Sequence, residues 1–158
     1  MSTRVPMDWR NPVHILASGF GSGLARHAPG TLGTLAAIPI VLLAQGLPGW
    51  LYASVTLLMF VAGIFICGRA ARDWGVRDHP AIVWDEIVGL LVTMSLAPVG
   101  AGWLLAGFVL FRLFDIVKPW PISSVDRRMH GGLGIMLDDV VAGIIAGSIL
   151  YLGVRWLN

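Results

Sequence analysis

The feature that most constrains this chain is the length of its uncharged stretches. Residues 27–68 contain no Asp, Glu, Lys or Arg over 42 consecutive positions. A helix of about 20 apolar residues crosses the roughly 30 Å hydrocarbon core of a bilayer, so this stretch has room for two crossings. A turn around Pro48 divides it. We therefore predict membrane helices at about 32–47 and about 50–67, the first of them kinked near Pro39.

Composition supports a membrane protein over a soluble or a disordered one. The chain is 56% hydrophobic and only 13% charged, whereas soluble domains carry about 25% charged residues. Its 11 Lys and Arg residues are nearly balanced by 9 Asp and Glu, which argues against a nucleic-acid-binding surface. The first 26 residues contain no continuous apolar signal segment, so we expect a cytosolic N-terminus. We predict one membrane domain over residues 1–158.

A third uncharged stretch, residues 87–111, permits two interpretations because Pro and Gly interrupt its middle. One is a single broken helix that crosses the bilayer. The other is a hairpin of two short helices, at about 86–97 and 102–114, that returns to its starting side. If the chain returns, all basic residues except Arg155 face one compartment, as the positive-inside rule expects. We therefore predict the hairpin.

The last apolar segment, at about 139–157, carries Gly and Ala at three- and four-residue spacing. Such a ridge of small residues is typical of close helix packing in membranes. The predicted fold is thus an all-α, polytopic membrane helical bundle with a central short helical hairpin. Its polar loops lie on the cytoplasmic face.

Five carboxylates stand where apolar helices are predicted to begin or end. Two open the hairpin, one closes it and two open the last helix: Asp85, Glu86, Asp115, Asp138 and Asp139. The predicted topology brings them to one membrane face, where they would repel one another unless a divalent cation joins them. Carboxylates without a His or Cys cluster suit Mg²⁺, with Mn²⁺ as a substitute.

Helix capping explains some of these acids, because a negative charge is favourable at a helix N-terminus. It does not explain Asp115, which is predicted to follow a helix C-terminus. Asp115 lies three residues from both Arg112 and Lys118, so ion pairing is the alternative to metal binding for this carboxylate.

Groups suited to phosphate lie beside the acids. The segment GFGSGLARHAPGTLGTL, residues 19–35, offers backbone amides and the hydroxyls of Ser22, Thr31 and Thr34 at the start of a helix. A Gly-rich turn without a ligand is an equally common role for such a segment. Nearby cations suit either substrate phosphate or anionic lipid headgroups: Arg112, Lys118, Arg127 and Arg128.

Four segments together resemble the signature blocks of the phosphatidylglycerophosphatase A family. They occur in the family's order across about residues 13–157, at 19–35, 78–89 (DHPAIVWDEIVG), 111–122 (FRLFDIVKPWPI) and 131–143 (GGLGIMLDDVVAG). The resemblance implies a Mg²⁺-dependent lipid phosphatase of the bacterial inner membrane. Such an enzyme converts phosphatidylglycerophosphate to phosphatidylglycerol and inorganic phosphate in phospholipid biosynthesis, with its site facing the cytoplasm.

Matching the blocks to this chain, together with the charge argument, assigns three sets of residues. As catalytic residues we predict Asp85, Glu86, Asp115, Lys118 and Asp139. As metal ligands we predict Glu86, Asp115, Asp138 and Asp139. As substrate-binding residues we predict Ser22, Thr31, Thr34, Arg112, Lys118 and Arg127. Asp78 is similar to a family acid that precedes the Asp85 pair, and the attacking group is water or, as the alternative, a carboxylate.

Two other function classes remain as alternatives. A CDP-alcohol phosphotransferase also uses carboxylates and Mg²⁺ under a membrane, but its DGxxAR-type signature is missing from this chain. A non-enzymatic ion carrier is expected to bury charge at mid-membrane, yet residues 40–66, 88–111 and 140–154 contain none. The sequence leaves the oligomeric state and the number of metal ions open.

Overall fold

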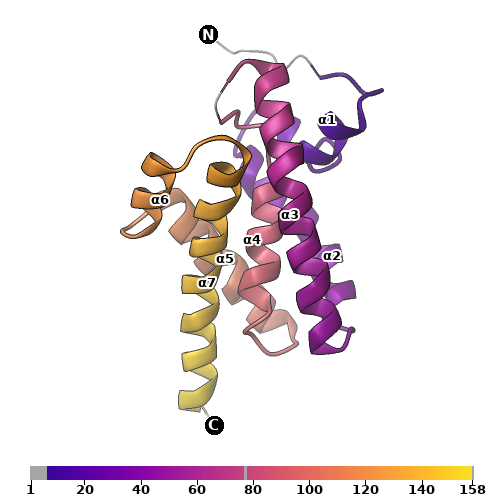
Figure 1. Ribbon diagram of the computed structural model, residues 1–158. Helices are drawn as coiled ribbons and strands as arrows, with labels where there is room; N and C mark the ends of the chain where they lie inside the picture. Colours follow the sequence, from indigo (N-terminus) through magenta and orange to yellow (C-terminus); the bar gives the residue numbers. More distant parts are fainter. Residues whose placement is uncertain (1–6, 77, 158) are drawn as a thin grey trace.

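The structure, a computed structural model, describes residues 7–76 and 78–157 and is built from helices (Figure 1). No strand occurs in these residues, which confirms the predicted all-α class. The elements are α1 (Pro12–Ala17), the short 3₁₀ helix η1 (Ser22–Leu24), α2 (Pro29–Ala44), α3 (Gly49–Trp74), α4 (Trp84–Met94), α5 (Ala101–Val117), α6 (Ile122–Arg128) and α7 (Gly131–Leu157).

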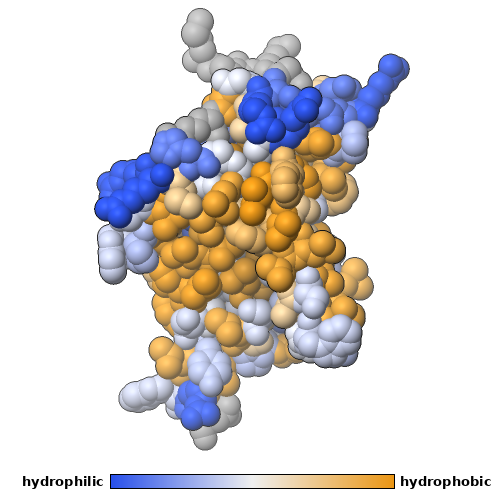
Figure 2. Space-filling model, viewed as in Figure 1, coloured by the Kyte–Doolittle hydropathy of each residue, from blue (hydrophilic) through white to orange (hydrophobic). Residues whose placement is uncertain are grey.

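Two helices, α3 and α7, are long and apolar enough to cross a membrane. The 26 residues of α3 rise about 39 Å, more than the roughly 30 Å apolar core of a bilayer. The face shown in Figure 2 is apolar over its middle and more hydrophilic toward both ends. Large apolar side chains of α3, such as Leu58 and Phe65, are exposed. The outer surface therefore suits an apolar surrounding.

Helix α4 forms the centre of the fold. Nine of its eleven residues are buried, because α2, α3, α5 and α7 all pack against it. After α4 the chain turns at residues 95–100, which include Pro98 and Gly100, and α5 runs back beside α4 (Figure 1). The structure thus contains the predicted helical hairpin, and its turn lies at the Pro and Gly residues that interrupt the uncharged stretch. The 11 residues of α4 rise only about 16 Å, which is too short for a full crossing.

Helix α7 packs closely on α4 through its small residues, as their spacing indicated. A Cβ atom added to Gly143 would lie 2.6 Å from the carbonyl oxygen of Gly89, and one added to Gly147 would lie 2.8 Å from that of Thr93. Both distances are below van der Waals contact, so a larger residue at either position would force the two helices apart.

The predicted start of α7, at about residue 139, is wrong by two turns. The helix begins at Gly131, which has a left-handed backbone conformation, and Gly132 allows close packing against α3. A Cβ atom on Gly132 would overlap the carbonyl oxygen of Ile64. Asp138 and Asp139 consequently lie inside the helix and do not open it, so N-terminal capping does not explain them.

Other predicted boundaries also shift. Asp115 lies in the last turn of α5 instead of following it. Helix α3 continues seven residues beyond the predicted end at 67, where an Arg69–Asp73 ion pair of 2.9 Å joins adjacent turns. Gly75, in a left-handed conformation, then ends the helix.

Candidate active site

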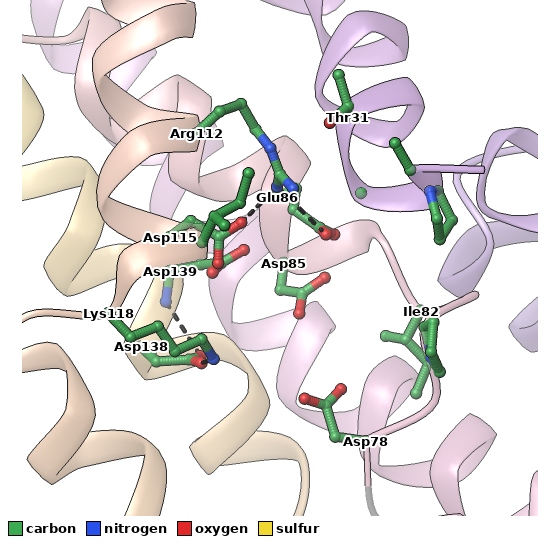
Figure 3. A pocket seen from close by; sticks show the side chains of 15 residues that line it. Thr31, Asp78, Ile82, Asp85, Glu86, Arg112, Asp115, Lys118, Asp138 and Asp139 are labelled. Atoms are coloured by element: carbon green, nitrogen blue, oxygen red, sulfur yellow. Dashed lines mark hydrogen bonds and ion pairs between the residues drawn. The ribbon is translucent and has the colours of Figure 1, made fainter.

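A polar cavity of about 370 Å³ opens at the end of the bundle where α2 and α4 begin and α5 ends (Figure 3). The loop before α4 and the third turn of α7 complete its wall. Most of the predicted acids line it, together with two cations and the first turn of α2. The lining residues are Ala28, Pro29, Gly30, Thr31, Asp78, Pro80, Ile82, Asp85, Glu86, Arg112, Asp115, Ile116, Lys118, Asp138 and Asp139.

Three of the acids form a compact group, here called the acid trio. Asp85, Glu86 and Asp139 each place one carboxylate oxygen within 4.8 Å of the other two. Each also has a buried oxygen, Oδ1, Oε2 and Oδ2 respectively, without a hydrogen-bond partner in the described residues. Unpartnered buried carboxylates are costly, and hard cations prefer oxygen donors of this kind. The acid trio therefore fits Mg²⁺ or Mn²⁺.

The other two predicted ligands, Asp115 and Asp138, are each paired with a cation (Figure 3). The Arg112 guanidinium forms an ion pair with Asp115, and its Nη1 atom lies 3.6 Å from Oε1 of Glu86. Lys118 forms an ion pair with Asp138, and its Nζ atom lies 3.4 Å from Oδ1 of Asp126. The structure thus brings Asp85 into the acid group and gives Asp115 the ion-pair partner that its spacing indicated.

Lys118 is held as a cation at the edge of the cavity. It caps the C-terminus of α5 in a left-handed backbone conformation, which turns the chain back toward the cavity. Burial disfavours its charged form, but the hydrogen bond to Asp138 and the nearby carboxylates outweigh burial and raise the pKa of Lys118 above its ordinary value. Lys118 therefore stays protonated at neutral pH.

The glycines of the 19–35 segment let α2 approach the acids. A Cβ atom on Gly30 would overlap Oε1 of Glu86 and lie 2.9 Å from Nη2 of Arg112. A Cβ atom on Gly33 would overlap Val83, just before α4. Close approach at these two positions requires glycine, and it places the N-terminal turn of α2 in the cavity wall.

The predicted substrate-binding residues divide into two groups. Thr31, Arg112 and Lys118 line the cavity, whereas Ser22, Thr34 and Arg127 do not. The Ser22 hydroxyl donates to the carbonyl oxygen of Gly19 at 2.9 Å, and the buried Thr34 hydroxyl donates to that of Gly30 at 2.8 Å. Arg127 is exposed on α6. Local backbone bonds thus occupy two of the three hydroxyls that the sequence suggested for phosphate.

Asp78 and Ile116 are among the lining residues to which the sequence assigned no role. Asp78, noted only for its similarity to a family acid, lies in the loop before α4, and burial raises its pKa despite the opposing effect of Lys118. Ile116 contributes an exposed apolar side chain to the rim of an otherwise polar cavity. No sequence signal distinguishes Ile116 from the other apolar residues of α5.

Comparison with known proteins agrees with this arrangement. A sequence model of the family described as Phosphatidylglycerophosphatase A matches residues 15–154. Phosphatidylglycerophosphatase A of Escherichia coli K12 is 51% identical over 92% of this chain and 86% of its own length. The protein of the same name from Haemophilus influenzae is 43% identical over 93% of this chain and 91% of its own.

A further relative, from Bacteroides thetaiotaomicron, is named a putative phosphatidylinositol-3-phosphatase. It is 37% identical over 90% of this chain and 93% of its own length. No solved structure matches the chain significantly. The family match and the two high-identity relatives cover nearly the whole chain, so the chain belongs to the phosphatidylglycerophosphatase A family.

Proposed function

We propose that this protein hydrolyses the terminal phosphomonoester of phosphatidylglycerophosphate and releases phosphatidylglycerol and inorganic phosphate. Its family and two relatives are named for this activity. The observation that carries the proposal is the acid trio, whose unpartnered oxygens share one cavity with Arg112 and Lys118. Carboxylates that can hold a metal, beside cations that can neutralise phosphate, are what phosphomonoester hydrolysis requires.

We propose that the acid trio holds Mg²⁺, for which Mn²⁺ can substitute. Glu86 and Asp139 belong both to the trio and to the ligand set predicted from sequence, and Asp85 joins them because its Oδ1 atom is also unpartnered. Asp115 and Asp138 serve instead to hold Arg112 and Lys118. When bound, the ion neutralises phosphate charge and makes water a stronger nucleophile.

The cations and the start of α2 bind the phosphate. Arg112 offers planar N–H donors suited to phosphate oxygens, and its pairing with Asp115 fixes the direction of the guanidinium group. Lys118 adds a second positive charge from the end of α5. Thr31 and the N-terminal amides of α2 complete the anion site, since the helix N-terminus favours negative charge.

Hydrolysis forms one bond to phosphorus and breaks another. The oxygen of a water molecule attacks phosphorus, and a cavity carboxylate accepts the proton that this water loses. The bond from phosphorus to the terminal glycerol oxygen breaks, and that oxygen takes up a proton as phosphatidylglycerol leaves. Direct attack by a carboxylate is the alternative, and acid quenching with ³²P-labelled lipid would then trap labelled protein.

We further propose that the chain is one multi-pass domain of the bacterial inner membrane, with the cavity at the cytoplasmic side. The predicted cytoplasmic segments 1–30, 68–86 and 112–139 together carry ten of the eleven basic residues, in accordance with the positive-inside rule. Exposed Trp50 begins α3 and exposed Trp156 ends α7, at the end away from the cavity (Figure 1). Tryptophans at this level suit the opposite interface, and the α4–α5 hairpin is re-entrant.

The decisive test is phosphate release from phosphatidylglycerophosphate in detergent micelles by purified protein, with Mg²⁺ and with EDTA. We expect metal-dependent release that Asp115→Asn reduces at least about 100-fold, because Arg112 loses its partner. Asp8→Asn is the control, since Asp8 is exposed and outside the cavity lining. Absence of release by folded wild-type protein contradicts the proposal, and release of CMP from a CDP-lipid would favour the phosphotransferase.

A further inference from the structure

We infer that the acyl chains of the lipid substrate lie along an apolar seam between α2 and α5 that leads from the cavity into the bilayer. This inference rests on the proposed phosphatase function and adds to it the route of the hydrophobic part of the substrate. The seam is defined by Leu35 and Leu42 on α2 and by Leu105, Phe108 and Ile116 on α5.

The α5 side of the seam begins inside the cavity. Ile116 lines the cavity and is nevertheless 67% exposed. Residues three, four and seven positions apart share a helix face, so Arg112, Phe108 and Leu105 lie on the same side of α5 as Ile116. Leu105 is exposed and Phe108 is half-buried. This face therefore changes from charged at the cavity to apolar with increasing distance from it.

The α2 side has the same character. Thr31 lines the cavity, and Leu35 follows it by four residues and Leu42 by eleven, on the same helix face. Both leucines are exposed, whereas Gly33 and Ala37, on the inner face of α2, are buried. An apolar strip thus leads away from the cavity on this helix too.

The two strips belong to helices that contact each other little, although both pack against α4. Figure 3 shows α2, which carries Thr31, on one side of the cavity and α5, which carries Arg112 and Asp115, on the other. In this proposal the phosphate lies between these helices and the acyl chains lie against the exposed apolar strips that lead away from the cavity.

The length of the seam matches one acyl chain. From Thr31 to Leu42 is a rise of about 16 Å, and half of a roughly 30 Å hydrocarbon core is about 15 Å. A water-soluble phosphomonoester would gain nothing from such a strip, whereas a lipid keeps its chains at the depth of one leaflet. The match favours an acyl chain over a soluble ligand as the occupant.

The test compares the chain-length dependence of KM in two neighbouring variants, Ile116→Asn and Val117→Asn. Val117 is 63% exposed in the same helix turn but does not line the cavity, so it is a matched control. Phosphatidylglycerophosphates with six-carbon and with eighteen-carbon chains are compared in the same micelles. We expect the ratio of short-chain to long-chain KM to fall about tenfold in Ile116→Asn and to match wild type in Val117→Asn.

Leu35→Asn on the α2 side should reproduce the effect of Ile116→Asn, and Ile116→Ala provides a milder change should the Asn variant fold poorly. An unchanged KM ratio in the seam variants, or an equal fall in Val117→Asn, overturns the seam while the phosphatase function stands. A dimer of the wild-type protein that Ile116→Asn dissociates also overturns it, because a second copy is then the occupant. Wild-type protein that hydrolyses neither lipid overturns the proposed function itself.

Discussion

The two long helices α3 and α7 have nearly the same length and are both apolar enough to span a bilayer, yet they pack very differently. In the most apolar window of α3, 22% of the residues are buried, against 56% in α7. Helix α3 points Leu58 and Phe65 outward, whereas α7 places Gly143 against α4 and Asp139 in the cavity. Apolar composition thus predicts a span, while small and acidic residues distinguish the helix that builds the site.

The largest expected effect comes from replacing an aspartate of α7 with asparagine, and the same replacement on α3 is its comparison. Asp139→Asn on α7 should lower phosphatase activity about 1000-fold, because the acid trio loses one of its charges. Asp73→Asn on α3 should keep activity within a few-fold of wild type, since Asp73 pairs with His14 and Arg69 away from the cavity. Initial rates at saturating Mg²⁺ measure both. Equal losses of activity in the two variants would contradict the different roles given to α3 and α7.

A smaller loss of activity is expected when Lys118, at the end of α5, no longer pairs with Asp138 of α7. Lys118→Met should reduce activity about 100-fold, because Asp138 becomes an unpaired acid and the phosphate loses a positive charge. Lys118→Arg keeps the charge and should recover part of the rate. Steady-state kinetics of the two variants provide the test, and identical rates in both would show that charge at this position is unimportant.

Close packing of α7 predicts a difference between two of its glycines. Gly143→Ala should lower the free energy of unfolding by about 2 kcal/mol, because the added Cβ would lie 2.6 Å from the Gly89 carbonyl oxygen. Gly153→Ala has open space around it and should be neutral or slightly stabilising. Thermal unfolding in the same detergent compares them, and an equally stable Gly143→Ala protein would contradict the packing.

The smallest effect concerns a hydrogen bond between α3 and the C-terminal turn of α4. The buried Tyr52 hydroxyl donates to the carbonyl oxygen of Leu91 at 2.7 Å, so Tyr52→Phe should cost about 1 kcal/mol. Tyr151→Phe, at an exposed position of α7, is the control and should change stability very little. Unfolding midpoints in denaturant distinguish the two, and a neutral Tyr52→Phe would show that this hydrogen bond adds nothing to the stability of the α3–α4 contact.

Much of the fold could be predicted, because charged residues and the helix breakers Pro and Gly act on the local structure of the chain. The uncharged stretches located the helices, and Pro98 with Gly100 located the turn of the hairpin. The start of α7 could not be predicted, because Gly131 and Gly132 have the composition of a turn. The structure shows that the Ile64 carbonyl of α3 approaches Gly132 so closely that only glycine fits there.

The acids of the candidate site could be predicted, but their partners could not. All five acids at the predicted helix ends line the cavity. Sequence spacing suggested the pairing of Arg112 with Asp115, three residues apart on one helix. It could not show that Lys118 would pair with Asp138, twenty residues away, or that a third unpartnered oxygen of the trio would come from Asp85. Such contacts depend on how α4, α5 and α7 meet.

Because the acid trio combines residues that are far apart in the sequence, it can form only late in synthesis of the chain. Asp85 and Glu86 stand in the first turn of α4, and Asp139 follows Glu86 by 53 residues. At about 5–20 residues per second, the ribosome needs about 3 to 10 s to make the intervening chain. Until α7 has been made and has docked on α4, the nascent protein holds only two of the three acids. If the trio has the proposed role, the protein gains activity only when its last helix arrives and completes the site.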